Sequence, residues 1–331
     1  AGSTGYIGVQ LIKLLVKHKN VNIKYLCGNT SVGKKISSYD KSLTSKNLPK
    51  IIKYDKKYLD DVDIVFTALP NGEAQEISKD LNRKNVLIDL SADFRLEKKS
   101  EYLKWYKQKH KAINNIKKSI YSLPEIHGKK IKNFNIISCP GCYPTSVLLP
   151  LIPLIKKKSI FTNNIIIDSK SGYSGAGKNY KKKFNYKNFN SSTYAYSVNY
   201  HRHIAEIDQE LKEFKKDINF TFNPHLIPTF RGILSSIYIN KKKNISPEII
   251  TRALQSFYKN ERFVKILKSN SPLGTGNVIN TNNCEISVCS TLDKNKIIIL
   301  SAIDNLIKGA AGQAIQNMNL AFNYNPKLGL S

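Results

Sequence analysis

The sequence predicts an α/β protein, with a Rossmann-type, doubly wound parallel sheet and a second α+β domain built on a mixed sheet. Short apolar strands alternate with helices before about Cys142, and a glycine-rich turn stands at the mouth of the first helix. After Cys142 longer β-rich stretches replace that alternation. Strand–helix–strand alternation with short apolar strands is typical of parallel sheets covered on both faces.

The first part of the chain supplies the parallel sheet. Apolar residues from Ile7 to Leu15 recur at helical spacing, which predicts a helix from the glycine turn to about His18. Residues 21–27 alternate between apolar and polar types and therefore predict a strand. Buried strands are predicted at 63–69, 86–90 and 136–138, with a polar helix between the first two that ends near Asn82.

The later part of the chain predicts a different architecture. A helix over 145–155 leads to a strand at 165–168. Residues 304–322 predict a long helix near the end of the chain. Between them, β-rich stretches predict a mixed or antiparallel sheet, at 218–222, 233–239, 284–290 and 297–303.

The composition predicts a globular chain with free thiols. Of the 331 residues 41% are apolar, and Pro150 and Pro153 interrupt the longest candidate for a membrane span. Five cysteines, an odd number in a long chain, do not form the pattern of a disulfide framework. We therefore expect a reducing, cytoplasmic compartment and no membrane partner.

The net charge of +29 admits two interpretations. Only six of the 53 basic residues are Arg, and Lys is spread over segments that have the pattern of plain solvated faces. We expect this charge to reflect A/T-rich coding, with attraction of anionic substrates as a smaller contribution. The alternative is a nucleic-acid surface on the Lys- and Asn-rich segment 178–190, where Phe184, Tyr186 and Phe189 interleave with Lys.

The glycine-rich turn is the first candidate binding motif. Three glycines spaced by two residues allow a tight turn in which backbone N–H groups approach a pyrophosphate. The usual first spacing is one residue, so a turn without a ligand is the alternative. Such a turn normally follows a strand, and we expect a short strand before Ala1. The motif is Gly2-Ser3-Thr4-Gly5-Tyr6-Ile7-Gly8.

The segment after the second predicted strand favours NADP over NAD. An NAD enzyme usually places an acidic residue there to hold the ribose hydroxyls. Residues 27–35 contain no acid, but they offer the hydroxyls of Thr30 and Ser31 and the ammonium of Lys34. These groups suit a 2′-phosphate.

The second motif, Ser138-Cys139-Pro140-Gly141-Cys142-Tyr143-Pro144-Thr145, lies between a strand end and a helix start. The helix dipole and free N–H groups there favour a thiolate nucleophile. Cys139 and Cys142 could form a dithiol redox pair, or one of them could attack a carbonyl alone. Two buried structural cysteines are the third possibility.

A proton shuttle for such a thiol is predicted at His201-Arg202-His203, followed by Glu206. Two residues apart in an extended segment, the histidines would share a face. A metal is not expected, since no third and fourth ligand is evident. A general acid/base His, with Arg202 binding an anionic group, explains more. Of the remaining histidines, His225 is expected to be structural and the others to lie at the surface or in loops, namely His18, His110 and His127.

Two further segments are rich in small residues. Residues 169–178 combine Gly and Ser with Lys and could form a backbone nest for an anion, or a plain flexible loop. Residues 305–314 open the late helix with Gly and Ala. Small residues there would admit another backbone or a flat ring, or would serve helix packing alone.

These motifs together resemble the N-acetyl-γ-glutamyl-phosphate reductase family over essentially the whole chain. So many motifs in one order are far more specific than any single one. The matching stretches are Gly2 to Gly8, 68–72, 88–95, 121–125, 140–145, 170–177, 200–203, 224–228 with Arg231-Gly232, and 303–310.

The resemblance implies a dinucleotide-binding domain over 1–141 and 304–331, and a dehydrogenase-type catalytic, substrate and oligomerisation domain over 142–303. It implies NADPH-dependent reduction of N-acetyl-L-glutamyl 5-phosphate to the 5-semialdehyde and phosphate, in arginine biosynthesis, by a homodimer or homotetramer. Cys142 would form a thioester, and His203 or His201 would manage the proton. Cys139 departs from the family pattern, which makes a dithiol pair accidental. An aspartate-semialdehyde type of dehydrogenase is the alternative.

The resemblance also implies which residues bind ligands. The residues expected at the cofactor are Gly2, Ser3, Thr4, Gly5, Tyr6, Gly8, Thr30, Ser31, Lys34 and Asn305. Those expected at the substrate are Arg95, Ser171, Gly172, Arg202 and Arg231.

Overall fold

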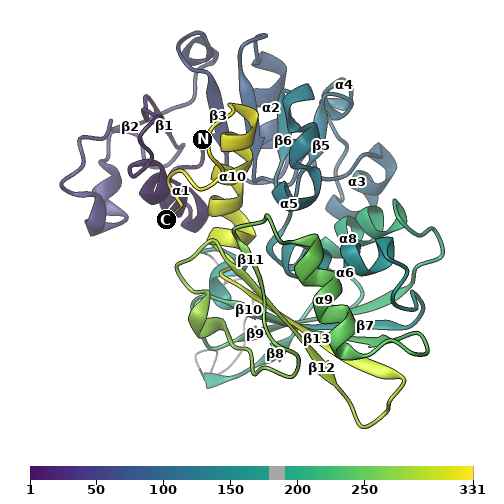
Figure 1. The fold of residues 1–331 in the computed structure, drawn as a ribbon. Helices are drawn as coiled ribbons and strands as arrows, with labels where there is room; N and C mark the ends of the chain where they lie inside the picture. Colours follow the sequence, from purple (N-terminus) through teal and green to yellow (C-terminus); the bar gives the residue numbers. More distant parts are fainter. Residues whose placement is uncertain (179–190, 331) are drawn as a thin grey trace. The chain divides into compact units, whose positions relative to one another are not determined.

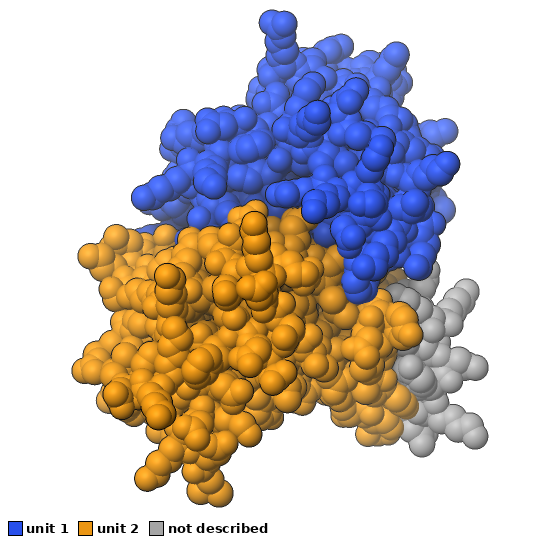
Figure 2. All heavy atoms as spheres, turned by 90° about the vertical axis from the view of Figure 1, so that its right-hand side faces the viewer, with its two compact units in different colours: residues 1–140, 310–331 blue, residues 141–309 orange. Residues whose placement is uncertain are grey.

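Two units make up the part of the chain that the computed structural model describes, residues 1–178 and 191–330 (Figure 1; Figure 2). Unit 1 comprises residues 1–140 and 310–331, and unit 2 comprises residues 141–309. Phe184, Tyr186 and Phe189, the aromatic residues of the nucleic-acid alternative, lie outside the described residues. Within the described ranges, no helix is both long enough and apolar enough to cross a membrane.

The strand pairs described in unit 1 are all parallel, which confirms the predicted sheet type. Ala1 lies between two groups of strands: its carbonyl accepts from the N–H of Ala68 at 3.0 Å, and the N–H of Gly2 donates to Cys27 at 3.1 Å. One group is β1 (Leu26–Cys27) with β2 (Ile51–Ile52). The other has the order β3–β4–β6–β5, made of β3 (Ile64–Thr67), β4 (Val86–Asp89), β6 (Ile136–Ser138) and β5 (Ser119–Tyr121).

Helices cover both faces of this parallel sheet. Leu87 and Ile88 are neighbours in β4, so their side chains point to opposite faces. Ile88 belongs to a core with residues of α1 (Tyr6–Leu15) and α10 (Gly312–Ala321). Leu87 belongs to a separate core with Ala74 of α2 (Glu73–Asp80). The other helices of unit 1 are α3 (Lys99–Tyr106), α4 (Ile113–Ile116) and α5 (Pro124–His127).

The strand predicted at 21–27 forms only at its end. Exposure still alternates from Val21 to Tyr25, as the sequence pattern requires. Only Leu26 and Cys27 pair, with Ile51 and Ile52. Alternation determines which side chains face inward, whereas a ladder also needs a neighbouring strand.

Unit 2 is built on a mixed sheet, as predicted. Its seven described strands have the order β11–β12–β13–β10–β7–β9–β8. The pairs β7–β9 and β11–β12 are parallel, and the remaining pairs are antiparallel. The strands are β7 (Ile165–Gly172), β8 (Tyr194–Ala195), β9 (Phe220–Ile227), β10 (Ile233–Asn240), β11 (Val264–Ile266), β12 (Cys284–Ser290) and β13 (Lys296–Ile303).

Three helices lie on one face of this sheet (Figure 1). The central one is α6 (Cys142–Lys156), which contacts α8 (His203–Lys212), α9 (Pro247–Phe257) and strands β10 and β13. Tyr143 to Ile155 are all buried, and α6 therefore forms the centre of the core of unit 2.

Helix α6 continues through Pro150 and Pro153, although proline in a helix interior removes a backbone hydrogen bond. Pro153 leaves the carbonyl of Leu149 without its usual N–H donor. The hydroxyl of Tyr258 donates to that carbonyl at 2.6 Å. The tertiary structure thus satisfies an acceptor that the helix itself does not.

Removing this hydroxyl should destabilise unit 2. We expect Tyr258→Phe to lower the free energy of unfolding by about 1–2 kcal/mol, because the Leu149 carbonyl would be left buried without this donor. Denaturant titration measures the change. Tyr238→Phe, in a side chain that is 39% exposed, is the matched control and should change it by less than about 0.5 kcal/mol. Equal effects of the two substitutions would contradict this account.

The late helix predicted over 304–322 is interrupted at its start. Residues Ile307–Ala311 form a π-helical turn, η8, and α10 follows from Gly312. The buried carboxylate of Asp304 accepts the N–H groups of Leu306 and Ile307 at 2.8 and 3.1 Å. A π-turn inside a helix is often found at functional sites.

Candidate active site

Cys142 occupies the first position of α6, with Gly141 as the preceding N-cap residue. Its side chain is half-buried and its thiol forms no disulfide. Pro144 has no N–H, so the backbone donors of Cys142 and Tyr143 are those of the first turn. A thiolate at this position is stabilised by the positive end of the fifteen-residue helix.

Gly309 lies against the candidate nucleophile. A Cβ atom on Gly309 would be 2.6 Å from the Cβ of Cys142 and 3.1 Å from its Cα. No side chain fits at that distance. The small-residue pattern at 305–314 therefore has a local cause, because the π-helical turn passes directly beside the start of α6.

His203 and Glu206 flank the backbone just before Cys142. Glu206 is fully buried, and one of its carboxylate oxygens accepts the N–H of Gly141 at 2.8 Å. The other oxygen is 3.8 Å from Nε2 of His203. A Cβ on Gly141 would be 2.3 Å from the same Nε2, so the imidazole lies directly on that glycine.

The prediction that the two histidines share a face of an extended segment is wrong. His203 is the first residue of α8, and the backbone turns between it and His201. The N–H of His203 donates to Nδ1 of His201 at 3.2 Å, which satisfies one of the free N–H groups at the helix start. The two rings remain neighbours, with centroids 4.6 Å apart.

Aromatic side chains surround this histidine pair. The ring of Tyr143 lies 5.4 Å from that of His201 and 5.8 Å from that of His203. Tyr196 lies 5.5 Å from His201, and Phe222 of β9 closes the cluster. Burial raises the pKa of both tyrosines well above the usual range. No role is predicted from the sequence for Tyr143, Tyr196 or Gly309. Glu206 has a local signal, because it stands one helical turn after His203.

The candidate anion-binding residues of unit 2 are joined by hydrogen bonds to one another and to neighbouring segments. Gly172 donates to the carbonyl of Gly232 at 2.8 Å, and the side chain of Asn305 accepts the N–H of Gly232 at 2.9 Å. The amide of Asn305 also donates to Ser174 at 2.9 Å. The buried Asn305 side chain thus has structural partners, and the cofactor role assigned to it stays a prediction.

The arginine candidates differ in their surroundings. Arg231 pairs with the buried Asp304 at 3.1 Å. Arg95 belongs to unit 1 and donates to the carbonyl of Cys139 at 2.8 Å. Arg202 is exposed and precedes α8 directly. Arg202 is therefore the one with the most accessible guanidinium.

Cys139 differs from Cys142 in its burial, which lowers the reactivity of its thiol. It is fully buried among the apolar residues of unit 1, and burial raises the pKa of its thiol to about 12. Its sulfur accepts a weak hydrogen bond from Asn317 at 3.5 Å. A thiol with this pKa carries almost no thiolate at neutral pH, which counts against a dithiol pair.

The glycine turn has the backbone geometry that a pyrophosphate needs. Gly2 has φ +81°, and a Cβ there would be 2.3 Å from the carbonyl oxygen of Ala68. A Cβ on Gly8 would be 2.2 Å from the carbonyl oxygen of Gly2. No side chain caps α1 and no acid lies in its first turn. Ser3 is already engaged, with its hydroxyl on the carbonyl of Cys27 at 3.0 Å.

The segment after β1 also fits a phosphorylated ribose. Thr30 and Lys34 are exposed, and the hydroxyl of Tyr39 donates to that of Ser31 at 2.7 Å. The first acid after Cys27 is Asp40, which is paired with Lys13 at 3.0 Å. A carboxylate that could accept the ribose hydroxyls is therefore missing between Gly28 and Tyr39.

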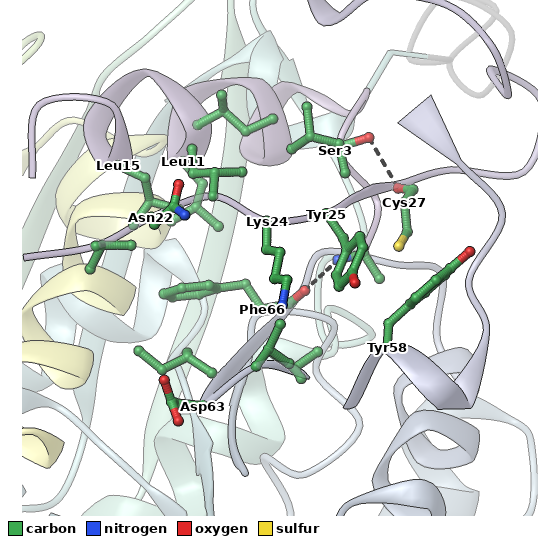
Figure 3. Close-up of a pocket in the computed structure, with 18 of the residues that line it drawn as sticks. Ser3, Leu11, Leu15, Asn22, Lys24, Tyr25, Cys27, Tyr58, Asp63 and Phe66 are labelled. Carbon is green, nitrogen blue, oxygen red and sulfur yellow. Dashed lines mark hydrogen bonds between the residues drawn. The ribbon is translucent and has the colours of Figure 1, made fainter. Parts of the chain in front are cut away.

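A cavity of about 540 Å³ lies beside the glycine turn (Figure 3). It is bordered by residues 20–27 on one side and 61–66 on the other, with Leu11 and Leu15 of α1 among its walls. Its lining mixes apolar and polar side chains and includes Ser3 and Gly8 of the glycine turn, so the cavity adjoins this turn.

Of the three histidines predicted at the surface or in loops, His18 and His110 lie in loops, and His127 is instead the last residue of α5. All three are buried. Each has a polar partner that compensates its burial. His18 bonds to Asn319 at 2.8 Å, His110 bonds to the carbonyl of Asp93 at 2.9 Å, and His127 accepts the N–H of Leu123 at 3.2 Å. His225 has a structural contact with Asp168 at 3.1 Å.

Comparison with known protein families gives two matches along the chain. A profile of the semialdehyde dehydrogenase NAD-binding domain matches residues 1–134. A profile of the semialdehyde dehydrogenase dimerisation domain matches residues 142–305.

Curated relatives are similar over nearly the whole chain. An N-acetyl-gamma-glutamyl-phosphate reductase of Thermoanaerobacter pseudethanolicus is 44% identical, over 97% of this chain and 94% of the relative. One of Ehrlichia canis is 41% identical, over 100% of this chain and 96% of the relative.

Solved structures with the same fold include aspartate semialdehyde dehydrogenases. That of Vibrio cholerae, complexed with ASA, has a TM-score of 0.70 and 16% identity, over 97% of this chain and 96% of the other. That of Candida albicans, with NADP, has a TM-score of 0.66 and 16% identity, over 96% of both chains. At this identity the likeness shows the fold.

Proposed function

The chain belongs to the N-acetyl-γ-glutamyl-phosphate reductase family, and we propose that it reduces N-acetyl-L-glutamyl 5-phosphate to N-acetyl-L-glutamate 5-semialdehyde and phosphate, with NADPH, in arginine biosynthesis. The observation that carries the proposal is the arrangement at the start of α6. A half-buried thiol at a helix N-terminus has an imidazole and a buried carboxylate at the residue before it.

The glycine turn and the segment after β1 are the residues that would hold NADP(H). The first-turn N–H groups of α1 suit the pyrophosphate, and Thr30, Ser31 and Lys34 suit the 2′-phosphate. When bound, NADPH supplies the hydride that reduces the thioester carbon. Preference for NADP over NAD follows from the missing acid in this segment.

The first chemical step belongs to Cys142. Its thiolate forms a bond to the acyl carbon, the bond from that carbon to the phosphate oxygen breaks, and a thioester remains. Phosphate leaves with the bonding electron pair and takes up one proton. We assign that proton to Nε2 of His203, the imidazole nitrogen beside Gly141, which becomes cationic when it first accepts the proton of the Cys142 thiol.

The second step regenerates the thiolate. Once the thioester carbon is reduced, the tetrahedral oxyanion collapses, the carbon–sulfur bond breaks, and the aldehyde is released. A proton from solvent then restores the thiol for the next cycle. The N–H of Cys142 at the helix start is the oxyanion donor in this proposal. Arg202 supplies a guanidinium for an anionic group of the substrate, and Arg95, Ser171, Gly172 and Arg231 are the further substrate residues that the family resemblance suggests.

Glu206 has a positioning role in this proposal. Its carboxylate holds the N–H of Gly141 and faces the imidazole that becomes cationic. We expect Glu206→Gln to lower kcat about 10–100-fold with a smaller change in KM, because the amide can still accept from Gly141 but carries no charge. Steady-state kinetics against pH measure this.

Asp208→Asn is the matched control on the same helix. Asp208 pairs with Lys212 at 2.8 Å near the surface, and its neutralisation should change kcat less than twofold. A Glu206→Gln enzyme with the control's activity would contradict the positioning role.

The substrate class is tested by assay in the reverse direction. Phosphate-dependent reduction of NADP⁺ should proceed with N-acetylglutamate semialdehyde and should be far slower with aspartate semialdehyde. The opposite preference would favour the aspartate-semialdehyde alternative. Activity with neither aldehyde would contradict the proposed function.

Three broader properties complete the proposal. The match of 142–305 to a dimerisation domain supports a homo-oligomer, a dimer or a tetramer. We propose that 1–141 with 304–331 bind the dinucleotide and that 142–303 carry catalysis, substrate binding and oligomerisation. A reactive thiol that forms no disulfide, together with NADPH chemistry, supports a cytoplasmic location.

A further inference from the structure

His201 is held at both ring nitrogens. Its Nδ1 accepts the backbone N–H of His203 at 3.2 Å, and its Nε2 lies 3.3 Å from the hydroxyl of Tyr196. A nitrogen that accepts a hydrogen bond carries no proton. The ring therefore carries its proton on Nε2 and donates it to Tyr196.

The hydrogen bonds continue from Tyr196 in one direction. Its hydroxyl donates to that of Tyr143 at 3.4 Å, and Tyr143 donates to the backbone carbonyl of His225 in β9 at 3.0 Å. A carbonyl has no proton to give back, so it determines the direction of the whole series. Burial raises the pKa of both tyrosines, and both hydroxyls keep their protons at neutral pH.

The surroundings of His201 disfavour a positive charge on its ring in addition to the one that His203 carries during the reaction. The Nδ1 atom of His201 faces the N-terminus of α8, which is the positive end of that helix. The ring of His203 is 4.6 Å away and becomes cationic in the proposed reaction. The buried carboxylate nearby, Glu206, faces His203. Among the residues that the structure describes, the other titratable or charged groups of this cluster are Cys142, Tyr143, Tyr196 and Arg202.

We propose that the N–H of His203 keeps His201 neutral because it occupies Nδ1, and that Tyr196 and Tyr143 are positioning residues that hold the ring in this orientation, with its proton on Nε2. His203 alone then carries the proton of the reaction. This inference rests on the proposed function for its catalytic consequence. The protonation state itself depends only on the hydrogen bonds. The histidine pair then has a division of roles, in which one ring supports the start of α8 and the other exchanges protons.

The protonation state is measurable directly by ¹⁵N NMR of the full-length protein labelled at histidine. Long-range ¹H–¹⁵N correlations distinguish the two neutral forms and the cation, and His201→Asn assigns the signals. We expect His201 to remain in the Nε2–H form from pH 5.5 to 8.5. A His201 that titrates in this range, or that carries its proton on Nδ1, would overturn the proposal.

The role of the tyrosines is tested by removing one hydroxyl. In Tyr196→Phe the ring loses the contact that holds its Nδ1 on the N–H of His203, and Nδ1 becomes free to turn toward solvent. We therefore expect His201 to titrate within the same range, and the acid limb of the kcat/KM profile to steepen from one proton to two. Tyr200→Phe, in an exposed tyrosine next to His201, is the matched control and should leave both readouts unchanged. A Tyr196→Phe enzyme with the wild-type spectrum and profile would exclude the positioning role.

The two proposals fail in different ways. If the Nε2–H form is observed but neither aldehyde is oxidised, the proposed function fails and the account of His201 stands. If the reductase is active and His201 titrates like a free imidazole, the division of roles fails and the proposed function stands.

Discussion

Replacement of Cys142 with alanine is expected to lower kcat/KM by at least about 10⁴-fold, because no other side chain can form the thioester. The measurement is NADP⁺ reduction in the presence of N-acetylglutamate semialdehyde and phosphate. Circular dichroism and denaturant titration should show a folded enzyme, since the half-buried thiol contributes little to packing.

Cys139→Ala is the matched control for this substitution. Its thiol is buried in unit 1 and has almost no thiolate form, so activity should stay within about threefold of wild type while stability falls by roughly 1 kcal/mol. Equal loss of activity in the two variants would favour a dithiol mechanism. Activity that survives in Cys142→Ala would refute the thioester.

Replacement of His203 with asparagine should lower kcat by about 10²–10⁴-fold, the usual contribution of a general acid/base. The imidazole lies on Gly141 and faces Glu206, so no neighbouring group can replace it at that position. The pH dependence of the residual rate should lose the limb that reports the imidazole. Steady-state kinetics between pH 5.5 and 9 measure both effects.

His201→Asn separates the two histidines. The asparagine carbonyl can still accept the N–H of His203, so α8 keeps its first hydrogen bond. We expect a loss of less than about tenfold, and the pH limb should remain. A greater loss in His201→Asn than in His203→Asn would reverse the assignment of the acid/base.

Sequence patterns determined the type of each sheet and most of its strands. The strands at 136–138 and 284–290 coincide with the predicted ranges. The first lies in a short apolar run and the second alternates between apolar and polar residues, and both patterns are typical of strands. Periodicity also located the helix that follows Cys142. The spacing of apolar residues is a local property, so it predicts a helix or strand without knowledge of remote contacts.

Local patterns could not determine pairing or burial. Residues 21–25 kept their alternation without a ladder, and three polar histidines became buried with specific partners. Both outcomes depend on groups remote in sequence: His18 reaches Asn319, some 301 positions later. Long-range contacts of this kind leave no periodic signature.

The candidate site shows the same division. Its motifs were visible in the sequence, since a cysteine between strand and helix and a histidine pair are local features. Only the tertiary structure placed Gly309 against Cys142 and the carboxylate of Glu206 on Gly141, 65 residues away. In our proposal the two histidines differ for the same reason, because the hydrogen bonds at both nitrogens of His201, rather than residue type, determine which ring exchanges a proton.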